Sequence, residues 1–185
     1  MDERKWIERI LAGDTQSFSC LVAKYEKMAY TIALCILENR EEAEEAVQDA
    51  FVKMYRALSD FHFDSKFSTW FYRIVYRTAL TALRQQRMFV SYEEAGPVDL
   101  SNDEVESATA LLEREDRKEM IARTLKKLPA DEALLLTLYY LEECSVEEIC
   151  QITELSASNV KVKLFRGRKR FYEVLQDKMK LETAD

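Results

Sequence analysis

The sequence predicts an all-α protein with two small helical domains joined by a flexible acidic linker and a helix-turn-helix in the second domain. Three observations lead to this fold class. The 185 residues include only three glycines and two prolines, so few residues interrupt helices. Apolar side chains recur at intervals of three and four over most of the chain, as in helices with one buried face. This periodicity disappears only between about residues 88 and 110.

The first domain is expected over residues 1–90 and should contain four helices. A short N-terminal helix ends at Gly13, and Asp14 or Thr15 can cap the second helix. The second helix carries a wide apolar stripe that should face the core. Its members are Phe18, Leu21, Val22, Tyr25, Met28, Ala29, Ile32 and Ile36.

The third helix is expected to begin at a capping box. Asn39 and Glu42 have the spacing at which each side chain satisfies a backbone N–H of the other. One side of this helix is apolar and should be buried. The other side is acidic, and such a face is either solvated surface or a docking surface for a partner. Its outward residues are Glu41, Glu45, Gln48, Asp49, Val52, Lys53 and Arg56.

The fourth helix follows a break rich in aromatic residues, and Ser68 or Thr69 can cap it. Five basic residues and no acidic one lie between Lys66 and Arg87. Rings interleaved with cations suit a single strand of nucleic acid, because bases stack on rings while cations hold phosphates. The alternative is a ring-rich core with a basic rim. The interleaved residues are Phe61, His62, Phe63, Lys66, Phe67, Tyr72, Arg73, Tyr76, Arg77, Arg84 and Arg87.

Residues 91–112 form the expected linker, because they hold six acidic side chains, no basic one and a glycine–proline break. The second domain is expected over residues 113–180. Its helical patterning stops at Pro129, and a further apolar helix covers residues 131–141.

The segment 145–171 has the layout of a helix-turn-helix, with a short helix, a tight break and a longer basic helix. Ser145 and Glu148 repeat the capping-box spacing, and Ser156 can cap the second helix. The helical period buries Val160 and turns other side chains outward. Those on the far side are Ser158, Val162, Phe165, Arg166 and Lys169, with Lys161, Lys163, Arg168 and Arg170 on the flanks. A basic outward face is typical of a helix that reads DNA.

The net charge of −7 would ordinarily argue against nucleic-acid binding. The distribution of charge reverses that inference. Residues 1–90 hold 13 basic and 13 acidic side chains, whereas 91–112 hold only acidic ones. Six basic residues and no acidic one lie between Lys161 and Arg170. Two local basic patches are therefore expected on an acidic background.

Several classes of function find no support in the sequence. The four cysteines form no Cys-x-x-Cys pair and His62 is the only histidine, so we expect free buried thiols, no metal and no cofactor. No spacing of residues indicates a catalytic site, so an enzyme is not expected. The charged N-terminus and the short apolar runs predict a cytoplasmic protein without membrane insertion.

Several stretches together closely resemble the bacterial extracytoplasmic-function (ECF) sigma factors. In chain order they are the acidic helix EEAEEAVQDAF, the loop and helix FDSKFSTWFYRIVYRTALTALR, an acidic linker, and EICQITELSASNVKVKLFRGRKRF. The resemblance runs from about Phe18 to Leu175. It implies a non-enzymatic subunit that binds RNA polymerase core and promoter DNA, helps to open the duplex, and is often held by an anti-sigma factor.

The resemblance also implies roles for individual residues. The docking helix for polymerase core matches Glu41, Glu45, Gln48, Asp49, Val52 and Lys53. In the family, a loop holds a flipped base of the minus-ten element in a pocket, and the helix after it lies along the melted strand. The residues that match this loop and helix are Phe61, His62, Phe63, Asp64, Ser65, Lys66, Phe67, Ser68, Thr69, Trp70, Arg73, Arg77 and Arg84. The reader of the minus-thirty-five element matches Ser158, Asn159, Lys161, Val162, Lys163, Phe165, Arg166 and Lys169.

Three positions depart from the commoner family residues. Arg77 stands where an asparagine often helps to hold the flipped base, and Thr81 stands where an acidic or amide residue is frequent. Glu154 replaces the frequent glycine of the turn. A non-glycine there must either adopt a left-handed conformation or alter the turn.

Two other functions are compatible with the residues. A helix-turn-helix regulator that binds as a dimer would need a palindromic site and a dimer interface, but the sequence has no zipper or ligand-domain pattern. A protein-binding helical adaptor would use the basic faces only as solvated surface.

Overall fold

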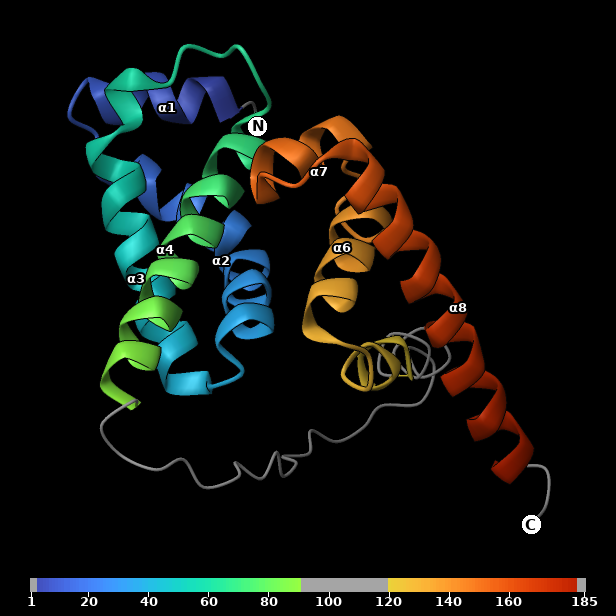
Figure 1. The fold of residues 1–185 in the computed structure, drawn as a ribbon. Coiled ribbons are helices and arrows are strands. Elements are labelled where there is room, and N and C mark those ends of the chain that lie inside the picture. The colour runs from blue at the N-terminus through green and yellow to red at the C-terminus, as the bar shows by residue number, and fades with distance from the viewer. Residues whose placement is uncertain (1–2, 91–119, 183–185) are drawn as a thin grey trace.

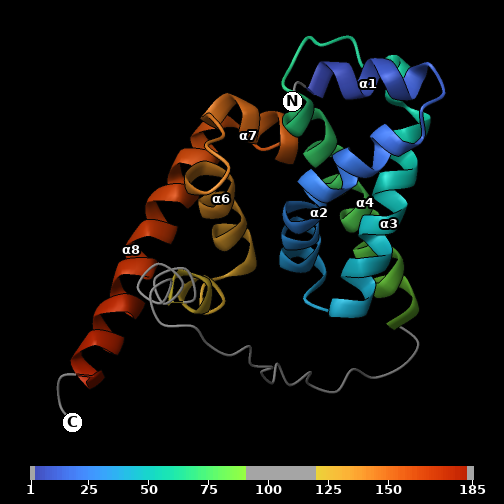
Figure 2. The same ribbon diagram turned by 180° about the vertical axis from the view of Figure 1, so that it is seen from behind.

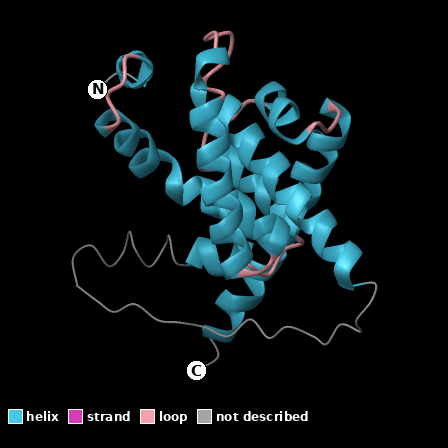
Figure 3. Cartoon of the chain, turned by 90° about the vertical axis from the view of Figure 1, so that its left-hand side faces the viewer, coloured by secondary structure: helices cyan, strands magenta, loops and turns pink. Residues whose placement is uncertain are grey.

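The computed structural model describes residues 3–90 and 120–182, and every regular element within them is helical (Figure 3). The all-α fold class is confirmed. The helices form an N-terminal unit of residues 3–90 and a C-terminal unit of residues 120–182, which lie beside one another (Figure 1). The predicted linker, residues 91–112, lies outside the described residues.

Three long helices build the N-terminal unit: α2 (Gln16–Leu37), α3 (Arg40–Arg56) and α4 (Phe67–Val90). Each of them packs against the other two. The short α1 (Glu3–Leu11) lies across one end of this bundle, against α2 and the 3-10 turn η1 (Leu58–Asp60) (Figure 1).

The core of this unit is rich in aromatic rings. Phe71 of α4 is fully buried, with its ring centroid 5.9 Å from that of Tyr25 and 4.8 Å from that of Phe51. Leu21 and Ile32 of the predicted α2 stripe are also fully buried. Rings bury more apolar area than other side chains, so this cluster is the main source of hydrophobic stabilisation in the unit.

The starts of α2 and α3 follow the predicted caps in part. Asp14 accepts the backbone N–H of Gln16 at 3.0 Å, and Asn39 accepts that of Glu42 at 3.1 Å. The other predicted hydrogen bond of the capping box, from the Asn39 backbone N–H to the Glu42 side chain, is wrong. The Glu42 carboxylate instead accepts a hydrogen bond from Gln86 of α4 at 2.9 Å. A tertiary partner has replaced the local one.

The predicted cap of α4 is also wrong. The helix begins at Phe67, so Ser68 and Thr69 lie within its first turn. This earlier start places the Phe67 ring in the core, 5.4 Å from Tyr25. Burial of a ring therefore decided where the helix begins.

The C-terminal unit starts with helical residues 120–125 and continues through α6 (Ala130–Tyr140), α7 (Val146–Thr153) and α8 (Ala157–Glu182). Pro129 separates the first two of these helices, as predicted. The first part of the helix expected before Pro129 lies outside the described residues.

Helices α7 and α8 form the predicted helix-turn-helix. Ser145 and Glu148 make both hydrogen bonds of the capping box, at 3.2 and 2.8 Å. Ser156 accepts the Asn159 N–H at 3.3 Å and caps α8. Glu154 ends α7 with a φ of 62°, so the turn keeps its left-handed residue although that residue is not glycine.

Gly167 allows α8 to cross α6 at close range. A Cβ at this position would lie 3.2 Å from Leu136 Cδ1 and 3.3 Å from Glu132 Cβ. Sequence analysis overlooked this residue, although a lone glycine within a strong helical pattern is a signal of close packing.

The core of the N-terminal unit can be tested by truncation. We expect Phe71→Ala to lower the free energy of unfolding by about 3–5 kcal/mol, because it leaves a cavity among buried rings. The exposed residue Val52 gives a control, and Val52→Ala should change this free energy by less than about 0.5 kcal/mol. Urea denaturation of both variants measures the difference, and similar effects would contradict the described packing.

Candidate nucleic-acid and partner interfaces

The outer face of α3 is exposed along its length. The side chains predicted for this face are all exposed, namely Glu41, Glu45, Gln48, Asp49, Val52, Lys53 and Arg56. Tyr55 was not predicted for this face, but it is 46% exposed and meets the Phe18 ring edge-on at 5.1 Å. Apolar side chains surrounded by charged ones have the composition of a protein interface.

The rings of the aromatic break divide into a buried set and an exposed set. Phe61 and Phe67 are only 6% and 3% exposed, and Trp70 packs on them at 5.1 and 5.5 Å. Phe61 and Phe67 are part of the core and present no exposed ring to a base, which differs from the expectation that they contact DNA directly. His62 and Phe63 are exposed. The sequence could not separate the two sets, because core packing and base stacking require the same residue types.

The exposed aromatic loop, residues 61–66, is held by an unexpected partner. Phe63 has a φ of 60°, which an aromatic residue rarely adopts, and its ring is 41% exposed. Arg4 of α1 lies over this ring, with its guanidinium carbon 4.8 Å from the centroid. This cation–π contact ties α1 to the tip of the loop, and no motif in the sequence indicated it.

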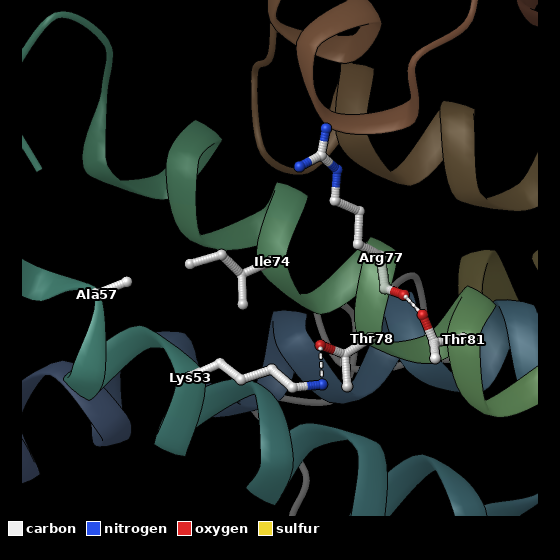
Figure 4. Close-up of a pocket in the computed structure, with 6 residues that line it drawn as sticks. All are labelled: Lys53, Ala57, Ile74, Arg77, Thr78 and Thr81. Atoms are coloured by element: carbon white, nitrogen blue, oxygen red, sulfur yellow. Dashed lines mark hydrogen bonds between the residues drawn. The ribbon is translucent and has the colours of Figure 1, made fainter. Parts of the chain in front are cut away.

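The outer edge of α4 carries the predicted basic residues, with Arg77 and Arg84 exposed and Arg73 half-buried. A shallow depression of about 270 Å³ lies between α3 and α4 (Figure 4). Inside it, Lys53 Nζ donates to Thr78 Oγ1 at 3.2 Å, whereas the Arg77 side chain points away from it. The depression is lined by Lys53, Ala57, Ile74, Arg77, Thr78 and Thr81. The depression therefore has on one surface Lys53, which is predicted to contact the polymerase, and Arg77, which is predicted to contact DNA.

The C-terminal unit packs on the N-terminal unit along α4 and α2, because α7 contacts α4 and α6 contacts α2 (Figure 2). Hydrogen bonds and ion pairs cross the boundary, with donors from residues 66–77 and glutamate acceptors from the other unit. They join Lys66 Nζ to Glu148 Oε1 at 3.0 Å, Thr69 Oγ1 to the same oxygen at 3.5 Å, Tyr72 Oη to Glu142 Oε2 at 2.6 Å, and the Arg77 guanidinium to Glu154 Oε1, with Nε at 2.9 Å.

Tyr72 belongs to the interleaved residues, for which the sequence left open a nucleic-acid surface or a ring-rich core. The structure places Tyr72 in the core, 2% exposed, because α2 and the C-terminal unit cover it. Burial raises the pKa of its hydroxyl, and the hydrogen bond to Glu142 raises that pKa further. The hydroxyl therefore stays protonated and donates to Glu142.

The ion pair between Lys66 and Glu148 consists of charged groups. The hydrogen bond to Glu148 raises the pKa of Lys66. Burial alone would raise the pKa of Glu148, but hydrogen bonds from the Ser145 N–H and from Lys66 outweigh it and leave that pKa lowered. Both groups are thus ionised near neutral pH.

The outward face of α8 is accessible. Phe165 is 64% exposed and Val162 is 44% exposed, which is unusual for apolar side chains on a packed helix. The other exposed residues of the predicted DNA-reading set are Ser158, Asn159, Lys161, Arg166 and Lys169. Lys163 differs from the others, because it is partly buried and its ion-pair partner, Asp131, lies on another helix, α6. Lys169 is exposed and pairs within α8 with Glu173, at 3.9 Å.

The described residues contain no cluster of histidine, cysteine or acidic side chains with the arrangement of a metal site. In the same ranges, no helix is long and apolar enough to cross a membrane.

All four cysteines are free, as predicted, but the prediction that they are buried holds only for Cys144. Cys20 is exposed, and Cys35 and Cys150 are partly buried. Burial raises the pKa of Cys144 to about 11, which keeps this thiol protonated and unreactive.

Comparison with protein families matches two parts of the chain. Residues 21–88 match the family described as sigma-70 region 2, and residues 118–171 match sigma-70 region 4. The chain is 31% identical over 181 residues to the RNA polymerase sigma-H factor of Pseudomonas aeruginosa, covering 94% of each. It is 31% identical over 170 residues to the ECF RNA polymerase sigma-E factor of Escherichia coli, covering 88% of each.

Solved structures have a similar fold at lower sequence identity. The sigma factor RpoE from Bartonella quintana, in complex with the anti-sigma factor NepR, aligns with a TM-score of 0.67 at 18% identity, covering 88% of this chain and 98% of that one. CnrH, in complex with the cytosolic domain of CnrY, aligns with a TM-score of 0.61 at 21% identity, covering 95% and 97%.

The lowered pKa of Glu148 predicts a dependence of stability on pH. The stabilisation it provides is complete above the ordinary glutamate pKa of 4.5 and is lost as the pH falls through the lower folded value. We expect the unfolding free energy to fall less between about pH 6 and pH 3.5 in Glu148→Gln than in the wild type. Glutamine preserves the capping box, so the comparison isolates the charge. Identical pH slopes in urea denaturation would contradict this assignment.

Proposed function

Since the chain belongs to the extracytoplasmic-function (ECF) group of the sigma-70 RNA polymerase sigma factors, we propose that its two helical units divide the work of promoter recognition. As a sigma factor, the chain directs transcription initiation by RNA polymerase. In this proposal residues 1–90 bind core polymerase and the minus-ten element, residues 113–180 bind the minus-thirty-five element, and residues 91–112 link them. The observation that carries it is that both sigma regions occur in one chain and each has an exposed charged face.

The outer face of α3 is the proposed contact with core polymerase. Its charged residues surround the exposed side chains of Val52 and Tyr55, so a complementary surface can bury apolar area at the centre and pair charges at the rim. The residues assigned to this contact are Glu41, Glu45, Gln48, Asp49, Val52 and Lys53, with Tyr55 added on the basis of its exposure.

The aromatic loop and the outer edge of α4 are the proposed contacts with the melted minus-ten strand. Exposed Phe63 can stack on a base, while Arg77 and Arg84 can hold phosphates. The buried rings of Phe61 and Phe67 act as the rigid base of the loop. The other residues assigned to this site are His62, Asp64, Ser65, Lys66, Ser68, Thr69, Trp70 and Arg73.

Helix α8 is the proposed reader of the duplex minus-thirty-five element. Val162 and Phe165 are placed to contact thymine methyl groups, and Ser158 and Arg166 are placed to hydrogen-bond base edges. Lys169 also reaches a base edge. Lys161 holds a phosphate, whereas Lys163 can do so only by leaving Asp131. Asn159 completes the assigned set.

The protein is proposed to act without catalysing a reaction and to work in the cytoplasm, where core polymerase and promoter DNA are found. We also propose that an anti-sigma factor holds it inactive. CnrH is in complex with the cytosolic domain of CnrY, and the sigma factor RpoE is in complex with the anti-sigma factor NepR. An anti-sigma factor could act by covering the exposed face of α3 or of α8.

The function is tested by reconstitution with core polymerase on a promoter library. We expect transcripts from a subset of promoters only when the protein is present. Arg166→Ala or Lys169→Ala should lower transcript yield about tenfold by removing contacts worth about 1–3 kcal/mol, without loss of stability. Lys127→Ala, which removes an exposed cation outside the assigned faces, is the matched control. No core-dependent transcription on any template would refute the function, and equal yields in all three variants would favour the adaptor alternative.

The contact with the polymerase is tested by charge reversal on α3. Glu45→Lys should weaken binding to core polymerase by about tenfold, because it places a like charge against the complementary surface. Glu26 is exposed on α2, outside the assigned face, so Glu26→Lys is the control. Fluorescence anisotropy of labelled protein titrated with core measures both, and equal weakening would show that the assigned face is wrong.

A further inference from the structure

We propose that Arg4 of α1 is a further contact of the protein with the minus-ten strand, because its guanidinium lies over the exposed ring at the tip of the aromatic loop. The loop follows η1 and arches over α1 (Figure 1). The inference rests on the proposed function of this loop, and it extends the DNA surface from α4 to the first helix of the chain.

The tip of the loop is held by two neighbours. The centroid of the Phe63 ring lies 4.7 Å from that of Phe61, which is buried, and 4.8 Å from the guanidinium carbon of Arg4. These contacts offset the cost of a φ of 60° at Phe63. The ring is still 41% exposed. A base that stacks on the exposed part of this ring therefore lies next to Arg4.

The first turn of α1 is anchored in the core, which fixes the place of Arg4 beside the loop. Ile7, about one turn later in the helix, is fully buried. Glu3 accepts a hydrogen bond from the Tyr25 hydroxyl, and the Tyr25 ring lies 5.4 Å from that of Phe67 at the end of the loop. Arg4 and the loop are thus positioned by the same packed rings, so less conformational entropy is lost when a strand binds.

The chemistry of Arg4 suits a strand of nucleic acid. Its side chain is 64% exposed although its guanidinium lies over a ring. A planar guanidinium stacks on bases, and its N–H groups match the oxygens of a phosphate. The Arg4 Nε pairs with Glu8 at 3.4 Å, and this exposed ion pair is weak, so a phosphate can replace the carboxylate.

The alternative role of Arg4 is to support Phe63 without contact to DNA. The two roles differ in how strand binding depends on salt. A cation that pairs with a phosphate releases a counterion, so its removal makes binding less sensitive to salt. Removal of a residue that only supports the loop leaves that sensitivity unchanged.

Arg4 is tested in the complex of the protein with core polymerase, using a fluorescently labelled single strand with the minus-ten sequence of a promoter from the library. Arg4→Ala should weaken binding of this strand by about tenfold, through loss of one stacked group. The slope of log affinity against log salt concentration should become shallower by about 0.7, as for one phosphate contact to a single strand. Arg4→Lys keeps the charge without the planar group, so it should weaken binding and keep the wild-type slope.

Arg9→Ala is the matched control, because it removes the same charge from the same helix. The Arg9 guanidinium pairs with Asp14, before the start of α2, at 3.0 Å. Affinity for the strand should therefore stay within about twofold of the wild type, with an unchanged slope. Equal effects of Arg4→Ala and Arg9→Ala would indicate a general loss of positive charge and would overturn the inference. A shallower slope in Arg4→Lys would also count against it.

Two further results would overturn the contact. One is unchanged affinity in Arg4→Ala, and the other is weaker binding with an unchanged slope, which would leave Arg4 as a support of Phe63 alone. Phe63→Ala in the same assay separates this inference from the proposed function. If Phe63→Ala does not weaken binding, the assignment of the loop is wrong and the inference fails with it. Weaker binding in Phe63→Ala but not in Arg4→Ala removes only the role of Arg4.

Discussion

The structure depends on the packing of α4, which must satisfy two neighbours at once. Its inner face carries Phe71 and Val75 into the ring-rich core, where both are fully buried. Its outer edge carries Arg77, and Lys66 directly precedes the helix. Both residues bind DNA in the proposed function and pair with glutamates of the C-terminal unit in this structure. Because the inner face is fixed by large buried rings, the outer edge is presented as a rigid surface.

The same constraint explains how the aromatic loop is supported. Phe61 and Phe67 are drawn into the core on either side of the loop, and Arg4 covers the ring of Phe63 at its tip. A loop that must hold an unstacked base gains from being ordered beforehand, because ordering it during binding would cost conformational entropy. In the proposed function, the buried rings contribute indirectly, by restricting the positions of the exposed ones.

Electrostatics separate the two proposed DNA surfaces of this acidic protein. The far side of α8 keeps most of its cations in solvent, whereas the cations of residues 66–77 pair with glutamates across the unit boundary. A net charge of −7 and occupied donors both weaken contact with DNA by the free chain. In the proposed function, specific binding therefore depends on the complex with core polymerase.

Local chemistry was enough for the sequence to determine the helices, the capping box at Ser145 and the outward faces of α3 and α8, since helical period and capping act over only a few residues. Tertiary structure decided the features that depend on distant neighbours. Glu42 bonded to Gln86 instead of completing its local cap, Phe67 and Tyr72 became buried, and Arg77 met Glu154 across the boundary. The same ring can pack in a core or against a ligand, and the same charged group can pair within the protein or with a ligand. Only the folded chain decides which of these partners lies close enough to make the contact.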